Sequence, residues 1–310
     1  MLLNAGATRN VGIDVAINTV NISNKDFSWR TTLNLSHNRN TVTRLTGEDR
    51  QLYEARFGFN QNTHILEVGE STGRFYGFET VGLYQVEDFD YNSRTHTYTL
   101  KDGVPCQGNR ATVQPGMWKF RDRDGDGVID ENDKTIVGST IPRYTYSLNL
   151  DFGWKGLRLS MLFQGVGKTD GYLNTYYVMP SNQGGTFRKE HIDFACAANP
   201  GGVTPRLTSA NKNNWYDSSF WMKSAAYLRL KNIQLGYDLP KSWMRKIGLK
   251  SAYVYVNAQN LFTATNFWDG YDPEVGYDGD ASGDFDLVKL GSANNYPQVK
   301  LVTIGLDLKF

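Results

Sequence analysis

Apolar and polar residues alternate along several stretches of this chain, most clearly between Gln298 and Phe310. In a β-strand, successive side chains point to opposite faces, so strict alternation predicts a strand between an apolar phase and a polar one. The chain ends on the aromatic ring of Phe310, and a final strand that ends in Phe is typical of outer-membrane β-barrels. The apolar face of this stretch carries Val302, Ile304, Leu306, Leu308 and Phe310, and the polar face carries Thr303, Gly305, Asp307 and Lys309.

Six further stretches alternate in the same way, and we expect strands that begin near residues 8, 26, 142, 156, 224 and 250. The clearest is a hairpin with a turn at Lys155-Gly156. In the stretch 224–239, Leu228 and Leu230 are out of phase, which predicts either a bulge or a strand that leaves the membrane near Arg229. The hairpin's apolar face holds Tyr146, Leu148, Leu150, Phe152, Leu157, Leu159, Met161 and Phe163, whereas Asn149, Asp151 and Arg158 lie on its polar face and Leu162 breaks the pattern.

The connections between these strands fall into two length classes. Short turns lie at 23–25, 155–156 and 240–249, and long connections at about 40–141, 169–223 and 265–296. Strands that alternate in direction place every short turn and the C-terminus on one side, as in outer-membrane barrels with periplasmic turns and long extracellular loops. The stretch 64–85 is Gly-rich and alternates poorly. The alternating strand directions allow either zero or two crossings between Asn40 and Pro142, and we favour zero. The region 40–141 is then one large extracellular excursion.

This organisation predicts an all-β fold, an antiparallel transmembrane β-barrel segment. Single-chain bacterial barrels have even strand numbers, and an open edge in lipid exposes unpaired backbone groups. About seven strands therefore indicate part of a larger barrel, with both terminal strands unpaired in the isolated chain. The N-terminus, 1–7, lacks the pattern of a signal peptide, which agrees with a chain incomplete at that end.

Composition narrows the function classes. The mean hydropathy is −0.49 and no apolar run approaches the ~18 residues of a transmembrane helix. The 33 basic and 32 acidic residues nearly balance, which argues against a nucleic-acid partner. Aromatic residues make up 13% of the chain, which suits membrane-interface girdles and glycan-binding surfaces alike.

Several short segments together resemble the C-terminal region of SusC/RagA-type TonB-dependent transporters. The resemblance covers essentially all of 1–310 in the family's order, and each motif alone is weak. The segments are Thr8–Asp14 (TRNVGID), Phe27-Ser28-Trp29, Pro115–Gly138 (PGMWKFRDRDGDGVIDENDKTIVG), Tyr227–Tyr237 (YLRLKNIQLGY), Asn260-Leu261-Phe262, Gly270–Val275 (GYDPEV) and the last strand.

The resemblance implies an outer-membrane importer of oligosaccharides or peptides in a Gram-negative, Bacteroidetes-like cell. It implies a plugged barrel of about 22 strands, a SusD-like surface lipoprotein as lid and contact with the TonB complex through a missing N-terminal part. The plug domain, the TonB box and the early strands are not found upstream. We therefore expect the C-terminal part of such a barrel, embedded in outer-membrane lipid.

An acidic loop between Asp122 and Asp133 carries the sharpest chemical motif. It follows the order of an EF-hand calcium loop, with Gly127 at the tight turn and Asp133 at the twelfth position, where Asp replaces the usual Glu. No helices flank the loop, and we predict a structural rather than a catalytic calcium ion. The alternative is a solvated acidic turn without a bound ion. The predicted calcium ligands are Asp122, Asp124, Asp126, the Val128 carbonyl, Asp130 and Asp133.

No catalytic constellation is found, so we predict that the chain is not an enzyme. The four histidines are scattered, and we expect His37, His64, His96 and His191 at the surface or in the lumen. Cys106 and Cys196 are equally compatible with a disulfide and with two free thiols. Six loop aromatics are candidates for stacking on sugars or on a lipoprotein, although ordinary loop packing explains each equally well: Tyr172, Tyr176, Tyr177, Trp215, Trp221 and Trp268.

Two other functions remain open. A small self-contained porin-like barrel is opposed by the odd strand number and the missing signal peptide. A soluble, calcium-stabilised, glycan-binding β-sandwich would also show alternating strands. The asymmetry of connection lengths and the terminal Phe310 argue against the sandwich.

Overall fold

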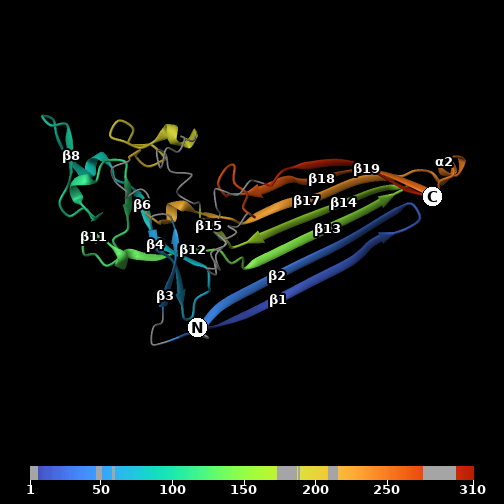
Figure 1. Ribbon diagram of the computed structural model, residues 1–310, viewed down its shortest axis with the longest axis horizontal. Coiled ribbons are helices and arrows are strands. Elements are labelled where there is room, and N and C mark those ends of the chain that lie inside the picture. Colours follow the sequence, from blue (N-terminus) through green and yellow to red (C-terminus); the bar gives the residue numbers. More distant parts are fainter. Residues whose placement is uncertain are drawn as a thin grey trace.

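The computed structural model of the protein describes residues 6–46, 51–57, 60–172, 187, 189–208, 216–274 and 298–310. One long, twisted antiparallel sheet dominates it, with a body of shorter elements at one end (Figure 1). In spatial order, the seven strands of the sheet are β1 (Gly6–Ser23), β2 (Phe27–Leu45), β13 (Tyr144–Trp154), β14 (Leu157–Gly167), β17 (Tyr227–Asp238), β18 (Ser251–Thr265) and β19 (Leu301–Lys309).

The seven predicted strands and their alternating directions are confirmed. Every neighbouring pair in the sheet is antiparallel, and β1 and β19 form its two edges. The sheet is therefore open within the part of the chain that the structure describes. The second strand is longer than predicted. We expected the long connection to begin at about residue 40, but β2 continues to Leu45 and is still paired with β1 there.

Pairing register carries the alternation from strand to strand. Leu150 pairs with Thr31 on β2 and Met161 on β14, whereas its neighbour Asp151 pairs with Arg30 and Ser160. Because the side-chain period is two, one sheet face is apolar and the other polar. The apolar face is not covered by other described elements, since Ile13 is 69% and Ile304 80% exposed.

The predicted bulge near Arg229 is confirmed and lies at Lys231. Relative to β14, β17 gains one residue between Leu230 and Asn232, and β18 makes room with Asn260, whose φ of 53° is left-handed. Asn tolerates this conformation better than most residues. The bulge returns Leu228 and Leu230 to the apolar face and leaves Arg229 on the polar face.

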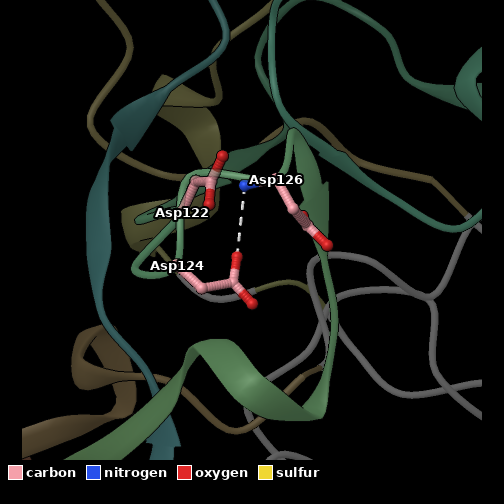
Figure 2. Close-up of side chains that lie close together, drawn as sticks. All are labelled: Asp122, Asp124 and Asp126. Carbon is pink, nitrogen blue, oxygen red and sulfur yellow. Dashed lines mark hydrogen bonds between the residues drawn. The ribbon is translucent and has the colours of Figure 1, made fainter.

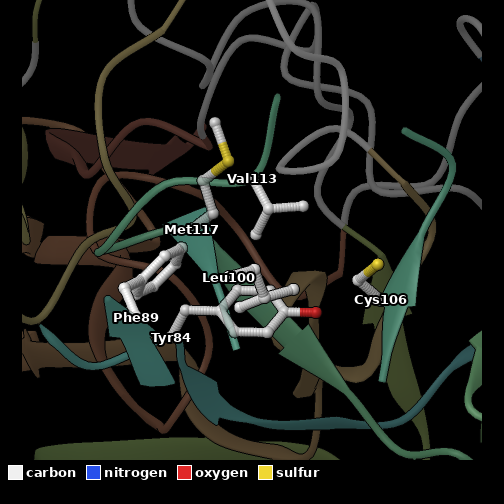
Figure 3. Close-up of a cluster of buried hydrophobic side chains, with 6 residues drawn as sticks. All are labelled: Tyr84, Phe89, Leu100, Cys106, Val113 and Met117. Atoms are coloured by element: carbon white, nitrogen blue, oxygen red, sulfur yellow. The ribbon is translucent and has the colours of Figure 1, made fainter. Parts of the chain in front are cut away.

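The long connections fold into a separate body with its own hydrophobic cores. One core cluster gathers around Tyr84 and Met117, from side chains within residues 84–117 (Figure 3). The stretch 64–85 adds no strand to the seven-stranded sheet, because its strands pair within two smaller sheets. The body contains β3 (Gln51–Phe57), β4 (Asn60–Glu67), β5 (Arg74–Phe78), β6 (Thr80–Leu83), β7 (Phe89–Asn92), β8 (Thr97–Leu100), β9 (Cys106–Gln107), β10 (Trp118–Phe120), β11 (Val128–Ile129), β12 (Lys134–Ser139), β15 (Asp170–Tyr172) and β16 (Met222–Ser224).

A short helix, α2 (Lys241–Lys246), occupies the turn between β17 and β18 beside the C-terminus (Figure 1). The sequence predicted only a short turn there, at 240–249. Among the described residues, no helix is long and apolar enough to span a membrane.

Two predicted surface histidines are buried instead. His64 on β4 is 2% exposed and packs against Phe75 with the rings tilted and their centroids 4.8 Å apart, and His191 is 8% exposed. The expectation for these two was wrong because it assumed that residues of long connections face water, whereas these connections form cores of their own. Cys106 is buried, and both cysteines are free thiols.

Candidate functional site: the polar sheet face and the acidic loop

The polar face of the sheet holds charged groups that hydrogen-bond across neighbouring strands. Near the short turns, Asp151 accepts hydrogen bonds from Ser160 Oγ and Asn149 Nδ2, each at 2.7 Å. Arg158 Nε donates to Asp238 at 2.6 Å, and its guanidinium lies 5.2 Å from the centroid of the Tyr253 ring. These strands border a hollow of about 380 Å³. The polar face therefore offers hydrogen-bonding and charged groups to a molecule bound in this hollow.

Leu162, the exception to the alternation, lies on this polar face. It pairs with Asn149 on β13 and Asn232 on β17. It borders a second hollow together with Asn34 and Ser147, which are joined by a 3.1 Å hydrogen bond. Because Leu162 lies between two asparagines, this face of the sheet is not uniformly polar.

Tyrosine rings cover glycines on neighbouring strands. Tyr146 donates its hydroxyl to the Tyr227 carbonyl at 2.8 Å, and its ring lies where a Cβ on Gly165 would stand, 2.5 Å from the nearest ring carbon. Tyr253 covers Gly236 in the same way, at 2.2 Å from its hydroxyl oxygen. Aromatic cover of strand glycines holds the register of a curved sheet.

A buried ion cluster joins β17 to the segment after β18. Arg229 donates to both carboxylate oxygens of Asp272, at 2.7 and 2.8 Å, and to Thr263 Oγ1 at 2.9 Å. Arg229 also pairs with Glu274, to which Lys231 donates at 2.9 Å. The Arg229 and Asp272 side chains are 2% and 7% exposed. The bulge at Lys231 allows Arg229 and Lys231, two residues apart, both to contact Glu274.

Both partners of this cluster lie in segments that carry the resemblance, but their contact was not predicted from the sequence. Arg229 lies in the segment Tyr227–Tyr237 and Asp272 in the segment Gly270–Val275. The sequence did contain a signal for this contact. The alternation of the strand shifts next to Arg229 and Lys231, and the later segment 270–275 contains two acidic residues. Such charges are costly to bury unless they pair.

The acidic loop brings three of its predicted ligands together. One oxygen from each of Asp122, Asp124 and Asp126 lies within 4.8 Å of the others. Figure 2 shows the Asp124 carboxylate receiving a hydrogen bond from the Asp126 amide, at 3.2 Å. Asp122 accepts from the amides of Gly125 and Gly127, whose φ values of 79° and 85° suit glycine.

Asp133 closes the same loop from the inside. It is fully buried at the end of the 3-10 turn Glu131–Asp133, and its two oxygens accept from the Arg123 amide at 2.6 Å and the Asp130 amide at 2.8 Å. It lies outside the group of three converging carboxylates. Asp130 is exposed and caps the turn by accepting from the Asn132 amide.

The surroundings of Asp124 shift the pKa of its carboxyl group. The hydrogen bond from the Asp126 amide lowers the pKa of Asp124, but partial desolvation and the neighbouring carboxylates of Asp126, Asp133 and Asp122 raise it more. The net pKa of Asp124 therefore lies above its ordinary value. A bound cation would relieve this repulsion.

The candidate stacking aromatics behave differently from one another. Tyr172 and Trp221 are 3% and 4% exposed and pack with Phe75 in a core cluster, so they serve loop packing. Trp268 is half-buried, with Lys223 Nζ 3.8 Å from its ring centroid. Tyr176, Tyr177 and Trp215 lie outside the described residues.

Comparison with known proteins identifies relatives of one kind. No family model matches the chain. TonB-dependent receptor P3 of Formosa agariphila is 31% identical in an alignment of 310 positions that covers 99% of this chain. The chain is similar to TonB-dependent receptors over its whole length. TonB-dependent receptor SusC of Bacteroides thetaiotaomicron is 27% identical over 326 residues, covering all of this chain.

The solved structure of the RagAB peptide transporter shares the fold, with a TM-score of 0.72 and 23% identity over 99% of this chain. The resemblance to SusC/RagA-type receptors and the all-β fold are thus confirmed. The chain spans 29% of receptor P3, 27% of SusC and 30% of the RagAB chain.

Proposed function

We propose that this chain forms part of the barrel wall of an outer-membrane, TonB-dependent nutrient importer of the SusC/RagA type. Its relatives are outer-membrane proteins of Bacteroidetes, which agrees with the predicted localisation. The importer takes up an oligosaccharide or a peptide, works with a SusD-like lipoprotein and depends on the TonB complex. The wall supplies binding surface and passage, and we assign it no chemical step.

The exposed apolar face of the sheet is the observation that carries this proposal. Large apolar side chains are exposed along β1, β18 and β19, including Ile13, Val256 and Ile304. A contiguous apolar surface of this kind is unusual for a protein surrounded by water. Across the sheet, the apolar face would contact lipid and the polar face the lumen.

The dimensions of the central strand fit a membrane. Tyr144 and Trp154 end β13 and are 40% and 56% exposed. Ten steps of about 3.4 Å separate them, about 34 Å along the strand, which a tilt of about 45° reduces to about 24 Å across the membrane. The lipid-facing band of outer-membrane barrels is about 25 Å tall, between aromatic girdles.

The same geometry disfavours both alternatives. A β-sandwich would cover the apolar face with a second sheet, but Ile13 and Ile304 are exposed. A self-contained barrel would pair β1 with β19, yet these strands are the two edges of the described sheet. Their free edges support pairing with further strands of a larger barrel.

Paired arginine substitutions on β13 test the orientation of the wall in the full-length protein. Leu150→Arg should destabilise the folded protein in bilayers by about 2–4 kcal/mol, because the charge would lie near mid-bilayer. Asn149→Arg, one residue away on the polar face, is the matched control and should cost less than about 1 kcal/mol. Equal costs, or a larger cost at Asn149, would refute the proposed register. The unfolding free energy in lipid vesicles measures both.

Uptake experiments test the transport proposal. Cells that lack the gene should lose uptake of a labelled oligosaccharide or peptide, and the wild-type gene should restore it. Uptake should also fall when TonB or the neighbouring lipoprotein is removed. Undiminished uptake of every tested oligosaccharide and peptide in the deletion strain would contradict the importer.

We further propose that the acidic loop holds one structural calcium ion on the extracellular side, within the region 40–141. Asp122, Asp124 and Asp126 support this, since one oxygen from each lies within 4.8 Å of the others. The Val128 carbonyl, Asp130 and Asp133 would complete the site, Asp130 through water. Extracellular calcium sites function near 10⁻⁴–10⁻³ M.

Calcium removal tests this site. A chelator should increase protease cleavage around β11 while the sheet stays folded, and Asp124→Asn should reproduce the effect with calcium present. Asp90→Asn, an exposed acid outside the loop, is the control. Cleavage that is independent of calcium would leave a solvated acidic turn.

A further inference from the structure

The short-turn end of the sheet carries a concentrated positive charge. The segment 239–251 contains Lys241, Arg245, Lys246 and Lys250 and no acidic residue. All four cations are exposed, and none takes part in the salt bridges found among the described residues. The opposite end is acidic, since the region 40–141 holds 16 acidic and 11 basic residues.

Large apolar side chains are exposed beside these cations. On α2, Trp243 is 60% exposed and Ile247, which follows the helix, is 65% exposed, whereas Met244 is 5% exposed and anchors the turn. A helical turn that presents a tryptophan and cations together is typical of the membrane–water interface, where the indole lies among headgroups and cations meet phosphates.

The position of α2 along the strands matches the depth of lipid headgroups. Trp154 pairs with Phe27 and Leu157, and Leu157 pairs with Tyr237, so an aromatic row ends the apolar face here. Lys241 follows the end of β17 by three residues, which is at most about 10 Å of chain. Headgroups extend about 5–8 Å beyond the hydrocarbon on each side.

We propose that the basic turn 240–250 is a binding surface for anionic phospholipid headgroups in the inner leaflet of the outer membrane. The cations bind lipid phosphates, and Trp243 with Ile247 inserts among the headgroups. This inference rests on the proposed membrane-spanning function. A zwitterionic lipid is bound less tightly, because its own cation offsets the phosphate.

Lipid selectivity of the full-length protein tests this surface. The protein, stripped of lipid in neutral detergent, is titrated with mixed micelles of phosphatidylglycerol and phosphatidylcholine, and the retained lipids are quantified by mass spectrometry. The variant K241Q/R245Q/K246Q removes three cations. The matched control R94Q/K101Q/K189Q removes three exposed cations from the long connections.

Wild-type protein and the control should prefer phosphatidylglycerol, and K241Q/R245Q/K246Q should lose roughly 100-fold of that preference. Each cation near an anionic surface contributes about fivefold in affinity. W243A should weaken retention of both lipids without changing their ratio. Unchanged thermal unfolding verifies that each variant is folded.

The proposal would be overturned if the wild type showed no preference for phosphatidylglycerol, or if the control variant lost as much of that preference as K241Q/R245Q/K246Q. It would also be overturned if glycerol phosphate at equal concentration displaced the lipid, which would indicate a soluble phosphate ester as the ligand. Membrane fractionation separates this outcome from the importer itself. A protein that sediments with the outer membrane but shows no lipid preference refutes only the lipid surface, whereas a protein absent from that fraction refutes the membrane wall.

Discussion

Removing Arg229 is the sharpest perturbation of the ion cluster that fastens the segment after β18 to the polar face. In Arg229→Met, the Asp272 carboxylate, 7% exposed, loses two hydrogen bonds to a cation. Glu274 keeps Lys231 as a partner at 2.9 Å. The variant therefore leaves one buried charge uncompensated, and breaking a buried pair in this way costs about 3–5 kcal/mol.

This loss of free energy should appear as local opening of the segment 267–274. One factor of ten in an opening equilibrium corresponds to about 1.4 kcal/mol, so amide hydrogen exchange there should accelerate by roughly two to four orders of magnitude. Hydrogen-exchange mass spectrometry of the full-length protein measures this. Exchange in β13 should not change, because its ladder does not involve Arg229.

Two further variants separate charge burial from simple loss of contacts. The double variant Arg229→Met/Asp272→Leu removes both members of the closest pair and should recover most of the protection, since apolar replacement of a buried pair is often close to neutral. Arg158→Met breaks the exposed pair with Asp238, with side chains 62% and 37% exposed, and should change exchange less than about fivefold. Less than tenfold acceleration in Arg229→Met would refute the reasoning and indicate that water already screens the cluster.

Two other predictions concern the sheet and the loop body. Gly165→Ala should destabilise the protein by about 1–3 kcal/mol in urea unfolding, because its Cβ would stand 2.2 Å from the Tyr227 carbonyl oxygen; Gly201→Ala, with no atom within 4 Å, should change little, and equal effects would contradict the close-approach argument. Burial lowers the pKa of His64 from 6.5 to about 4, so as the pH falls the unfolded chain takes up the proton at a higher pH than the folded chain does. The contribution of His64 to the free energy of unfolding is therefore complete above pH 6.5 and is lost as the pH falls toward 4. The total loss is about 3 kcal/mol. Thermal unfolding of the loop body between pH 7 and 4 should show this loss in the wild type and not in His64→Phe, and identical pH profiles would refute it.

The sheet was predictable from the sequence because each of its strands separates two phases. Alternation in β13 and β14 determines which residues share a face, and the two-residue turn at Lys155-Gly156 sets their register. The phase slip at Leu228 and Leu230 correctly predicted a bulge, because one extra residue restores the faces. Short turns determined three of the six neighbouring pairs, whereas long connections join the other three.

The long connections were less predictable, because their structure depends on contacts between distant segments. His64 carries no local signal of burial, and its environment comes from packing against Phe75 on the next strand. The ion cluster joins Arg229 to Asp272, 43 residues later. The acidic loop was predictable as a loop since its hydrogen bonds are local, whereas its calcium ion stays a prediction.

The distribution of buried residues shows how the two parts of the molecule depend on different surroundings. The core clusters around Phe75, Tyr84 and Phe78 all belong to the loop body, whereas the apolar face of the sheet is left exposed. The hydrophobic effect therefore holds the loop body together in water, but it can act on the sheet only when lipid covers the apolar face. The connections can then keep their shape outside the membrane by their own packing, and the Arg229 cluster fastens one of them to the wall.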